Sequence, residues 1–267
     1  MKQYTSFFRM RFLAGLQYRT AALAGMCTQA VWGLMEVFLY RAFYLSAPER
    51  LPMDMQALSS YIWMQQATLS IWMIFQWERE LFEAVHSGSV AYELVRPVDV
   101  YGMWAARSFA VRISRLLLRV APILFLGSLL PAPYGLRLTI SPGVFALFLV
   151  SAALTLWLGI SICMVCYCLT FYMTDYKGIM TFVPALSEIF SGDIIPLPFF
   201  PEPLRRFAEL SPFGSMQNVP LRIFGGDIAG SRIFSAMALQ LFWCLSITGL
   251  GYCLMRGGLR RTAIAGG

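Results

Sequence analysis

Charged residues are scarce in this sequence. Only 13% of its 267 residues are charged, whereas 58% are hydrophobic. An ordinary soluble domain has about 25% charged and about 45 to 50% apolar residues. The composition therefore argues against a typical soluble globular protein and predicts an integral membrane protein.

Residues that carry catalytic chemistry are also nearly missing. His86 is the one histidine, and no Ser, Cys or metal-ligand constellation accompanies it. The six cysteines all fall in apolar stretches, where a thiol behaves as a small apolar side chain. We therefore expect no enzymatic activity, no catalytic residue and no metal site on this chain.

Lysine is rare as well, because only Lys2 and Lys177 occur beside 19 arginines. Neither lysine lies in a G-x-x-x-x-G-K-[ST] motif, the loop that cradles nucleotide phosphates. We therefore expect no nucleotide-binding domain on this chain. If ATP drives its activity, the ATPase is another polypeptide.

Long apolar runs make up most of the chain. A membrane-spanning helix needs roughly 20 predominantly apolar residues, and six stretches reach or approach that length. We place the spans at Thr20–Tyr44, Leu58–Trp77, Met103–Leu130, Pro142–Cys168, Gly178–Ile195 and Ile233–Met255. The fifth is the weakest, because it contains Pro184 and Glu188. The expected fold is an all-α integral membrane protein with a single domain over residues 1–267.

The positive charges predict how the spans are oriented. Most of the 21 Lys and Arg residues fall on one side of the six-span arrangement, and the positive-inside rule puts that side, with both termini, in the cytoplasm. Because the net charge of +7 flanks apolar spans, we read it as a topology signal and expect no nucleic-acid partner. Before the first span, residues 4–18 mix aromatic and basic side chains, which predicts an interfacial helix on the membrane surface.

The longest cytoplasmic loop, residues 78–102, begins with an amphipathic pattern. The apolar face holds Leu81, Phe82 and Val85, and the opposite face holds Arg79, Glu80 and Glu83. Glu78 falls on the apolar side, and Pro97 ends any helix before it. A membrane-skimming helix with a solvated connector fits this loop, and so does a docking element that receives force from a soluble partner. The missing phosphate-binding loop favours the second interpretation.

Several motifs, taken in order, resemble the six-span permeases of ABC type-2 exporters. The cytoplasmic loop reads "HSGSVAYELVRPVDVY", with a Gly and then Leu-x-Arg-Pro, and the proline-rich segment before the last span reads "SGDIIPLPFFPEPLRRFAELSPFG" ahead of "IFGGD". The likeness extends over most of the chain. It is similar to the branch associated with export of drugs, viologen-like toxins, peptides or lipid-like molecules. The matching positions are Gly88, Leu94, Arg96 and Pro97 in the loop, and Gly192, Ile195, Pro196, Pro201, Leu204, Pro212, Phe213, Pro220 and Gly226 in the late segment.

The resemblance implies a permease of the bacterial cytoplasmic (inner) membrane that pairs with a second copy or a sister permease. Two separate nucleotide-binding subunits would dock below and hold ATP and Mg, so that no cofactor is expected on this chain. The cytoplasmic loop would be the coupling helix, and the late segment a re-entrant extracellular gate. The expected coupling residues are Glu78, Glu80, Glu83, His86, Gly88, Arg96 and Pro97, and the expected gate residues are Gly192, Asp193, Pro196 and Pro201.

Arg112, Arg115 and Arg119 are spaced by three and four residues and so share a helical face. Such a face can bind anionic lipid headgroups at the inner leaflet, or it can line a cytosolic vestibule. Membrane lipid is therefore an expected partner.

Glu36 lies well inside the first predicted span, and Glu188 lies inside the fifth. A charge near the bilayer centre costs about 2.5 to 3.5 kcal/mol on insertion scales, so these residues usually face a cavity or a partner. With Trp32 nearby as a face for a cation, Glu36 favours a positively charged amphiphile as cargo. Alternatively, Glu36 pairs with Arg41 or is protonated, and Glu188 supports the turn that follows it.

Other functions fit the same sequence. An ATP-independent secondary carrier or channel would use the buried carboxylates as ion or proton sites, although no internal repeat of the transporter kind is visible. A non-transporting membrane scaffold also remains open. Transport by the chain alone would identify the carrier.

Overall fold

The computed structural model describes residues 2–17, 19–46, 53–95, 97–137 and 140–265, which form helices and connecting loops without a strand. The prediction of an all-α fold is confirmed over these residues. The helices are α1 (Lys2–Gln17), α2 (Arg19–Ser46), α3 (Met55–Trp72), α4 (Arg79–His86), α5 (Ala91–Leu94), α6 (Val100–Leu129), α7 (Pro142–Leu169), η2 (Thr170–Tyr172), α8 (Lys177–Ser191), η3 (Leu197–Phe199), α9 (Glu202–Leu210), α10 (Asn218–Phe224) and α11 (Ser231–Ala265).

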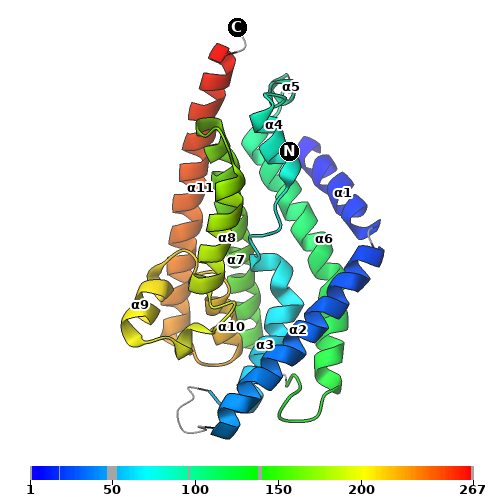
Figure 1. The fold of residues 1–267 in the computed structure, drawn as a ribbon, viewed down its shortest axis with the longest axis vertical. Helices are drawn as coiled ribbons and strands as arrows, with labels where there is room; N and C mark the ends of the chain where they lie inside the picture. The colour runs from blue at the N-terminus through cyan, green and yellow to red at the C-terminus, as the bar shows by residue number, and fades with distance from the viewer. Residues whose placement is uncertain (1, 18, 47–52, 96, 138–139, 266–267) are drawn as a thin grey trace.

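The long helices form an elongated bundle with two distinct ends (Figure 1). Both chain termini lie at the end that carries α4 and α5, which we call the α4 end. The short helices α9 and α10 lie toward the opposite end, the α9 end. Helix α7 packs most extensively against α11, and α6 packs against both α1 and α3.

Three helices among the described residues are long and apolar enough to cross a membrane. These stretches are Ala22–Ser46 in α2, Pro142–Tyr172 from α7 through η2, and Ser231–Arg261 in α11. The other long helices are more polar or shorter: α6 carries four arginines, and α8 has 15 residues. The chain is a multi-pass membrane protein by these features.

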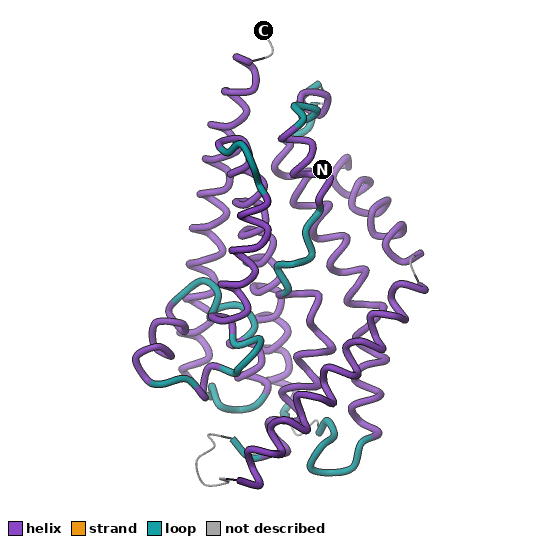
Figure 2. The backbone as a smooth tube through the Cα atoms, viewed as in Figure 1, coloured by secondary structure: helices purple, strands orange, loops and turns teal. Residues whose placement is uncertain are grey.

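The predicted second span extends too far, because α3 ends at Trp72 and residues up to Trp77 leave the helix. The backbone carbonyl groups at the end of α3 have no partner within the helix, and Arg112 of α6 supplies donors to them. Its Nη1 donates to the carbonyl oxygens of Ile71 at 3.3 Å and Met73 at 2.9 Å. The carbonyls at a helix end need such donors, and a cation there also complements the helix dipole. Figure 2 shows the loop after α3 crossing the middle of the bundle to reach α4.

The predicted fifth span also ends too late. Helix α8 stops at Ser191, because Gly192 takes the left-handed conformation (φ +82°) that a glycine adopts without strain. At 1.5 Å per residue α8 is about 22 Å long, short of the roughly 30 Å hydrocarbon core of a bilayer. By contrast, α11 continues well past Met255, the predicted end of the sixth span.

Candidate functional site

Helix α4 is fixed to the bundle through its apolar face. That face consists of Leu81, Phe82 and Val85, all buried. The Phe82 ring lies 4.8 Å from the ring of Tyr167 near the end of α7 and 5.0 Å from the stacked ring of Tyr176, the residue before α8. Phe82 is completely buried. A displacement of α4 must therefore move the α7–α8 junction with it or break this aromatic cluster.

A second attachment joins the start of α4 to α6. The side chain of Glu78 is 9% exposed and forms an ion pair with Arg107, which is 12% exposed. Ser108 Oγ donates to Glu78 Oε1 at 2.7 Å, and the Glu78 backbone N–H donates to the Tyr167 hydroxyl at 3.0 Å. Glu78 therefore points into the bundle and is not presented on the surface of the loop.

Glu80 is the outer partner of the same arginine. Its side chain is 70% exposed, and Arg107 hydrogen-bonds to it. The adjacent Arg107 guanidinium, with a smaller contribution from Arg11, holds the pKa of the Glu80 carboxyl below its ordinary value. Glu80 thus stays ionised and keeps Arg107 oriented toward α4.

The remaining predicted coupling residues lie on the outside. Glu83 and His86 are exposed, and the His86 ring meets Tyr176 edge-on at 5.8 Å. Gly88 ends α4 with φ +74° and is exposed, as is Pro97. Arg96 lies outside the described residues. The loop therefore offers a polar face of α4 followed by a tight glycine turn.

Beyond that turn, the loop ends in exposed apolar side chains that the sequence interpretation did not select. Tyr92 is 80% exposed and Val95 is 85% exposed, and we call these two residues the loop tip. Apolar side chains held out at the polar end of a molecule are typical of a protein-binding surface. Val95 lies two residues and Tyr92 five residues before Pro97, after an amphipathic helix, and this position was the available sequence signal.

The loop tip is held in place on both sides. Trp104 Nε1 of α6 donates to Glu93 Oε2 at 2.6 Å, directly between the two tip residues in the chain. Asp99 caps α6 through the Gly102 N–H at 2.7 Å, and its own N–H donates to the Tyr4 hydroxyl of α1 at 3.2 Å. The loop is thus oriented by α1 and α6 as well as by α7 and α8.

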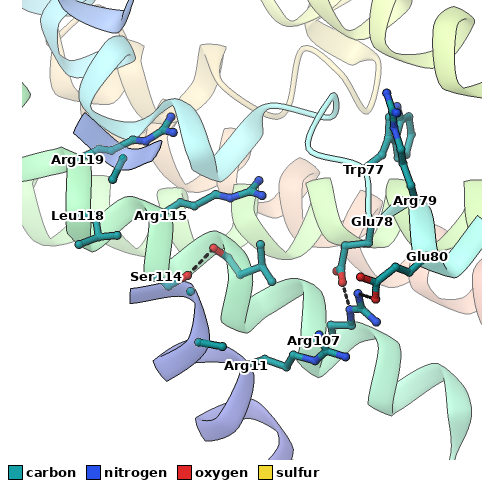
Figure 3. Close-up of a pocket in the computed structure, with 14 residues that line it drawn as sticks. Arg11, Trp77, Glu78, Arg79, Glu80, Arg107, Ser114, Arg115, Leu118 and Arg119 are labelled. Carbon is teal, nitrogen blue, oxygen red and sulfur yellow. Dashed lines mark hydrogen bonds and ion pairs between the residues drawn. The ribbon is translucent and has the colours of Figure 1, made fainter. Parts of the chain in front are cut away.

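A cavity of about 620 Å³ opens beside the start of α4, between α1, α2 and α6 (Figure 3). Arg115 and Arg119 reach into it from α6, while Arg11 comes from α1. The predicted common face of three arginines is therefore divided, because Arg112 is buried against the end of α3. The charged side chains that line the cavity are Arg11, Glu78, Arg79, Glu80, Arg107, Arg115 and Arg119.

The predicted cargo residues divide between two places. Glu36 and the half-exposed Trp32 line one groove of about 590 Å³ on the outer face of α2. Gln66 Nε2 donates to Glu36 Oε2 at 3.4 Å, while Arg41 lies over the Tyr134 ring, 5.3 Å from its centroid. The groove thus combines one carboxylate with apolar walls.

Glu188 does not line the α2 groove and lies beside the predicted gate residues. It lines a small crevice with Asp193, whose backbone oxygen and Oδ1 both accept from Gln65 Nε2, at 2.9 and 3.2 Å. The Gly192 carbonyl accepts from Gln217 Nε2 at 3.3 Å. Buried amides from α3 and from the turn before α10 therefore hold this segment. Of the remaining gate residues, Pro196 is buried and Pro201 is exposed ahead of α9.

A family model described as "ABC-2 family transporter protein" matches residues 30–266. No curated protein matches the chain. The matched residues begin within α2 and include α4, the loop tip, the α2 groove and the segment that holds Asp193. They leave out α1 and the beginning of α2.

Proposed function

This chain belongs to the ABC-2 family of transporter proteins, and we propose that it is the permease subunit of an ATP-driven exporter whose nucleotide-binding subunits are separate polypeptides. The observation that carries this proposal is α4. Its inner face packs into the bundle through Phe82, and its outer face is exposed. A docking helix needs this arrangement to receive a force from a soluble partner and transmit it to the bundle. The sequence contains no phosphate-binding loop of its own.

The proposed topology has six spans. Helices α3 and α6 cross the membrane beside the three strongly apolar helices, and the short α8 crosses it together with the re-entrant segment that follows Ser191. The termini and α4 then face the cytoplasm of a bacterial cell. Their common location at the α4 end supports this orientation, because an even number of crossings returns the chain to its starting side. The late segment with η3, α9 and α10 would form the extracellular gate.

Force would pass from the ATPase to the bundle by two routes. One runs from Phe82 to Tyr167 and Tyr176, and so to α7 and α8. The other runs from Glu78 to Arg107, and so to α6. Closure of the ATPase pair would move these helices together and switch the pathway between two paired permeases from inward to outward access.

We predict that changing the loop tip weakens binding of the ATPase without unfolding the permease. Exposed aromatic anchors of an interface contribute about 2 kcal/mol or more each, so Tyr92→Asp with Val95→Asp should weaken binding at least about 30-fold. The measurement is co-purification of the nucleotide-binding subunits with the full-length permease in mild detergent, with the number of permease copies counted in the same sample.

Leu210→Asp provides the matched control, because Leu210 is an exposed apolar residue at the α9 end. It should leave co-purification unchanged. Equal retention of the ATPase by the loop-tip variant and the wild type would contradict docking at this loop. A wild-type chain that purifies alone and transports without ATP would instead identify a secondary carrier.

The proposed cargo is a hydrophobic or amphiphilic small molecule, and the α2 groove favours a cation. Glu36 places a carboxylate among apolar walls, with Trp32 at the same groove. Glu36→Gln should therefore reduce stimulation of ATP hydrolysis by a lipophilic cation about tenfold and change stimulation by a neutral analogue of the same shape much less. Equal losses for both compounds would assign Glu36 a structural role.

A further inference from the structure

The cavity beside α4 has an excess of positive charge. Its two carboxylates, Glu78 and Glu80, both pair with Arg107. The four other arginines that line it make no ion pair within the described part of the chain, and they come from three different elements. These unpaired arginines are Arg11, Arg79, Arg115 and Arg119.

Several of their donors lack an acceptor. The Nε atoms of Arg11 and Arg119 are buried and have no hydrogen-bond partner among the described residues. Arg115 donates from Nη1 to the neutral side-chain oxygen of Gln76 at 2.9 Å. Arg119 lies tightly against Gly25 of α2, where any side chain would collide with its guanidinium. Helix α2 therefore closes one side of the cavity and leaves room for the Arg119 guanidinium at Gly25.

The position of the cavity along the membrane can be inferred from its lining. Ala22, the first residue of the apolar stretch of α2, lines the cavity. Trp77 lines it too, and tryptophan is enriched where a membrane meets water. The cavity therefore lies at the level where lipid headgroups begin.

We propose that this cavity binds the phosphate group of an anionic phospholipid, held by Arg11 of α1 and by Arg115 and Arg119 of α6. Guanidinium groups donate paired hydrogen bonds to phosphate oxygens and are more weakly hydrated than ammonium groups, which suits a partly buried site. Basic pockets between helices on the cytoplasmic side are suited to such headgroups. The volume of about 620 Å³ is that of a small-molecule site and has room for more than a phosphate ion.

A bound headgroup would also join parts of the molecule that α4 must move. Arg79 belongs to α4 and lines the same cavity, so a headgroup bound to α1 and α6 would lie beside the helix that we propose as the docking element. Lipid binding itself is measured on the permease alone. Its outcome is therefore independent of whether an ATPase docks at the loop tip.

The test measures the thermal stability of the full-length permease in an uncharged detergent, titrated with phosphatidylglycerol, phosphatidylcholine or sodium phosphate. Phosphatidylglycerol should raise the melting temperature at low concentration, and phosphatidylcholine should not. Arg115→Gln with Arg119→Gln should weaken the phosphatidylglycerol effect about 25-fold, at about fivefold per arginine. Arg115→Lys with Arg119→Lys keeps both charges but loses the paired hydrogen bonds, so its affinity should fall between that of the wild type and that of the glutamine variant.

Arg260→Gln is the matched control, since Arg260 is exposed near the end of α11 and does not line the cavity. If the double variant does not fold, Arg11→Gln alone should still weaken phosphatidylglycerol binding about fivefold. Equal stabilisation by both lipids would overturn the proposal. Stabilisation by sodium phosphate alone, lost in the glutamine variants, would assign the site to a soluble phosphate and overturn its assignment to lipid.

Discussion

Phe82→Ala is expected to lower the free energy of unfolding by about 3 to 5 kcal/mol, because it leaves a cavity in a completely buried aromatic cluster. The same change should uncouple ATP hydrolysis from transport, since α4 loses its main contact with the α7–α8 junction. Denaturant unfolding of the purified permease measures the first effect. Transport per ATP hydrolysed in vesicles containing the assembled complex measures the second.

Glu83→Ala is the control for Phe82→Ala, because Glu83 lies on the opposite, exposed face of α4. It should change the free energy of unfolding by no more than about 0.5 kcal/mol. A Phe82→Ala protein with wild-type stability would contradict the packing of α4. One that is destabilised yet transports the normal amount per ATP would contradict transmission of force through Phe82.

Arg107→Gln should cost about 3 to 5 kcal/mol of unfolding free energy, because it leaves the nearly buried carboxylate of Glu78 without its cation. A hydrogen bond from Ser108 remains but does not neutralise the charge. The loss should appear in the same denaturant experiment, and α4 should become accessible to proteolysis near Arg79.

The double variant Glu78→Gln with Arg107→Gln distinguishes the two contributions. Removing both charges takes away the unpaired carboxylate, so the double variant should be more stable than Arg107→Gln alone. If the double variant is the less stable of the two, the cost comes from lost packing and not from an uncompensated charge. Arg205→Gln, at the α9 end and outside the ion pairs of the described residues, should leave stability within about 0.5 kcal/mol of wild type.

Local pattern was enough to predict the class of fold and several element boundaries. Composition indicated a membrane protein, and apolar length placed α2, α6 and α7 close to where they occur. The helical spacing of apolar residues in the loop after α3 predicted that Phe82 and Glu83 lie on opposite faces. In the structure Phe82 is buried and Glu83 is exposed. These features depend on residues that are neighbours in the chain, so the sequence contains them directly.

The predicted end of α3 was wrong because a residue distant in the sequence stabilises that end. No residue near Trp72 signals the end of α3 in the sequence. The donors to its last carbonyl groups come from Arg112, some 40 residues later. In the same way, the common face of Arg112, Arg115 and Arg119 suggested one role for all three. In the bundle, Arg112 meets α3 while the other two meet a cavity closed by α1 and α2.

The sequence by itself determined that this chain is a helical membrane protein, that it carries an amphipathic loop helix and that it has no phosphate-binding loop. Only the tertiary structure decided that Glu78 turns inward to Arg107, that the loop tip is exposed and that a basic cavity forms beside α4. The physical reason is that periodicity fixes which face of a helix is apolar. Which charges meet depends on how helices distant in sequence pack against one another.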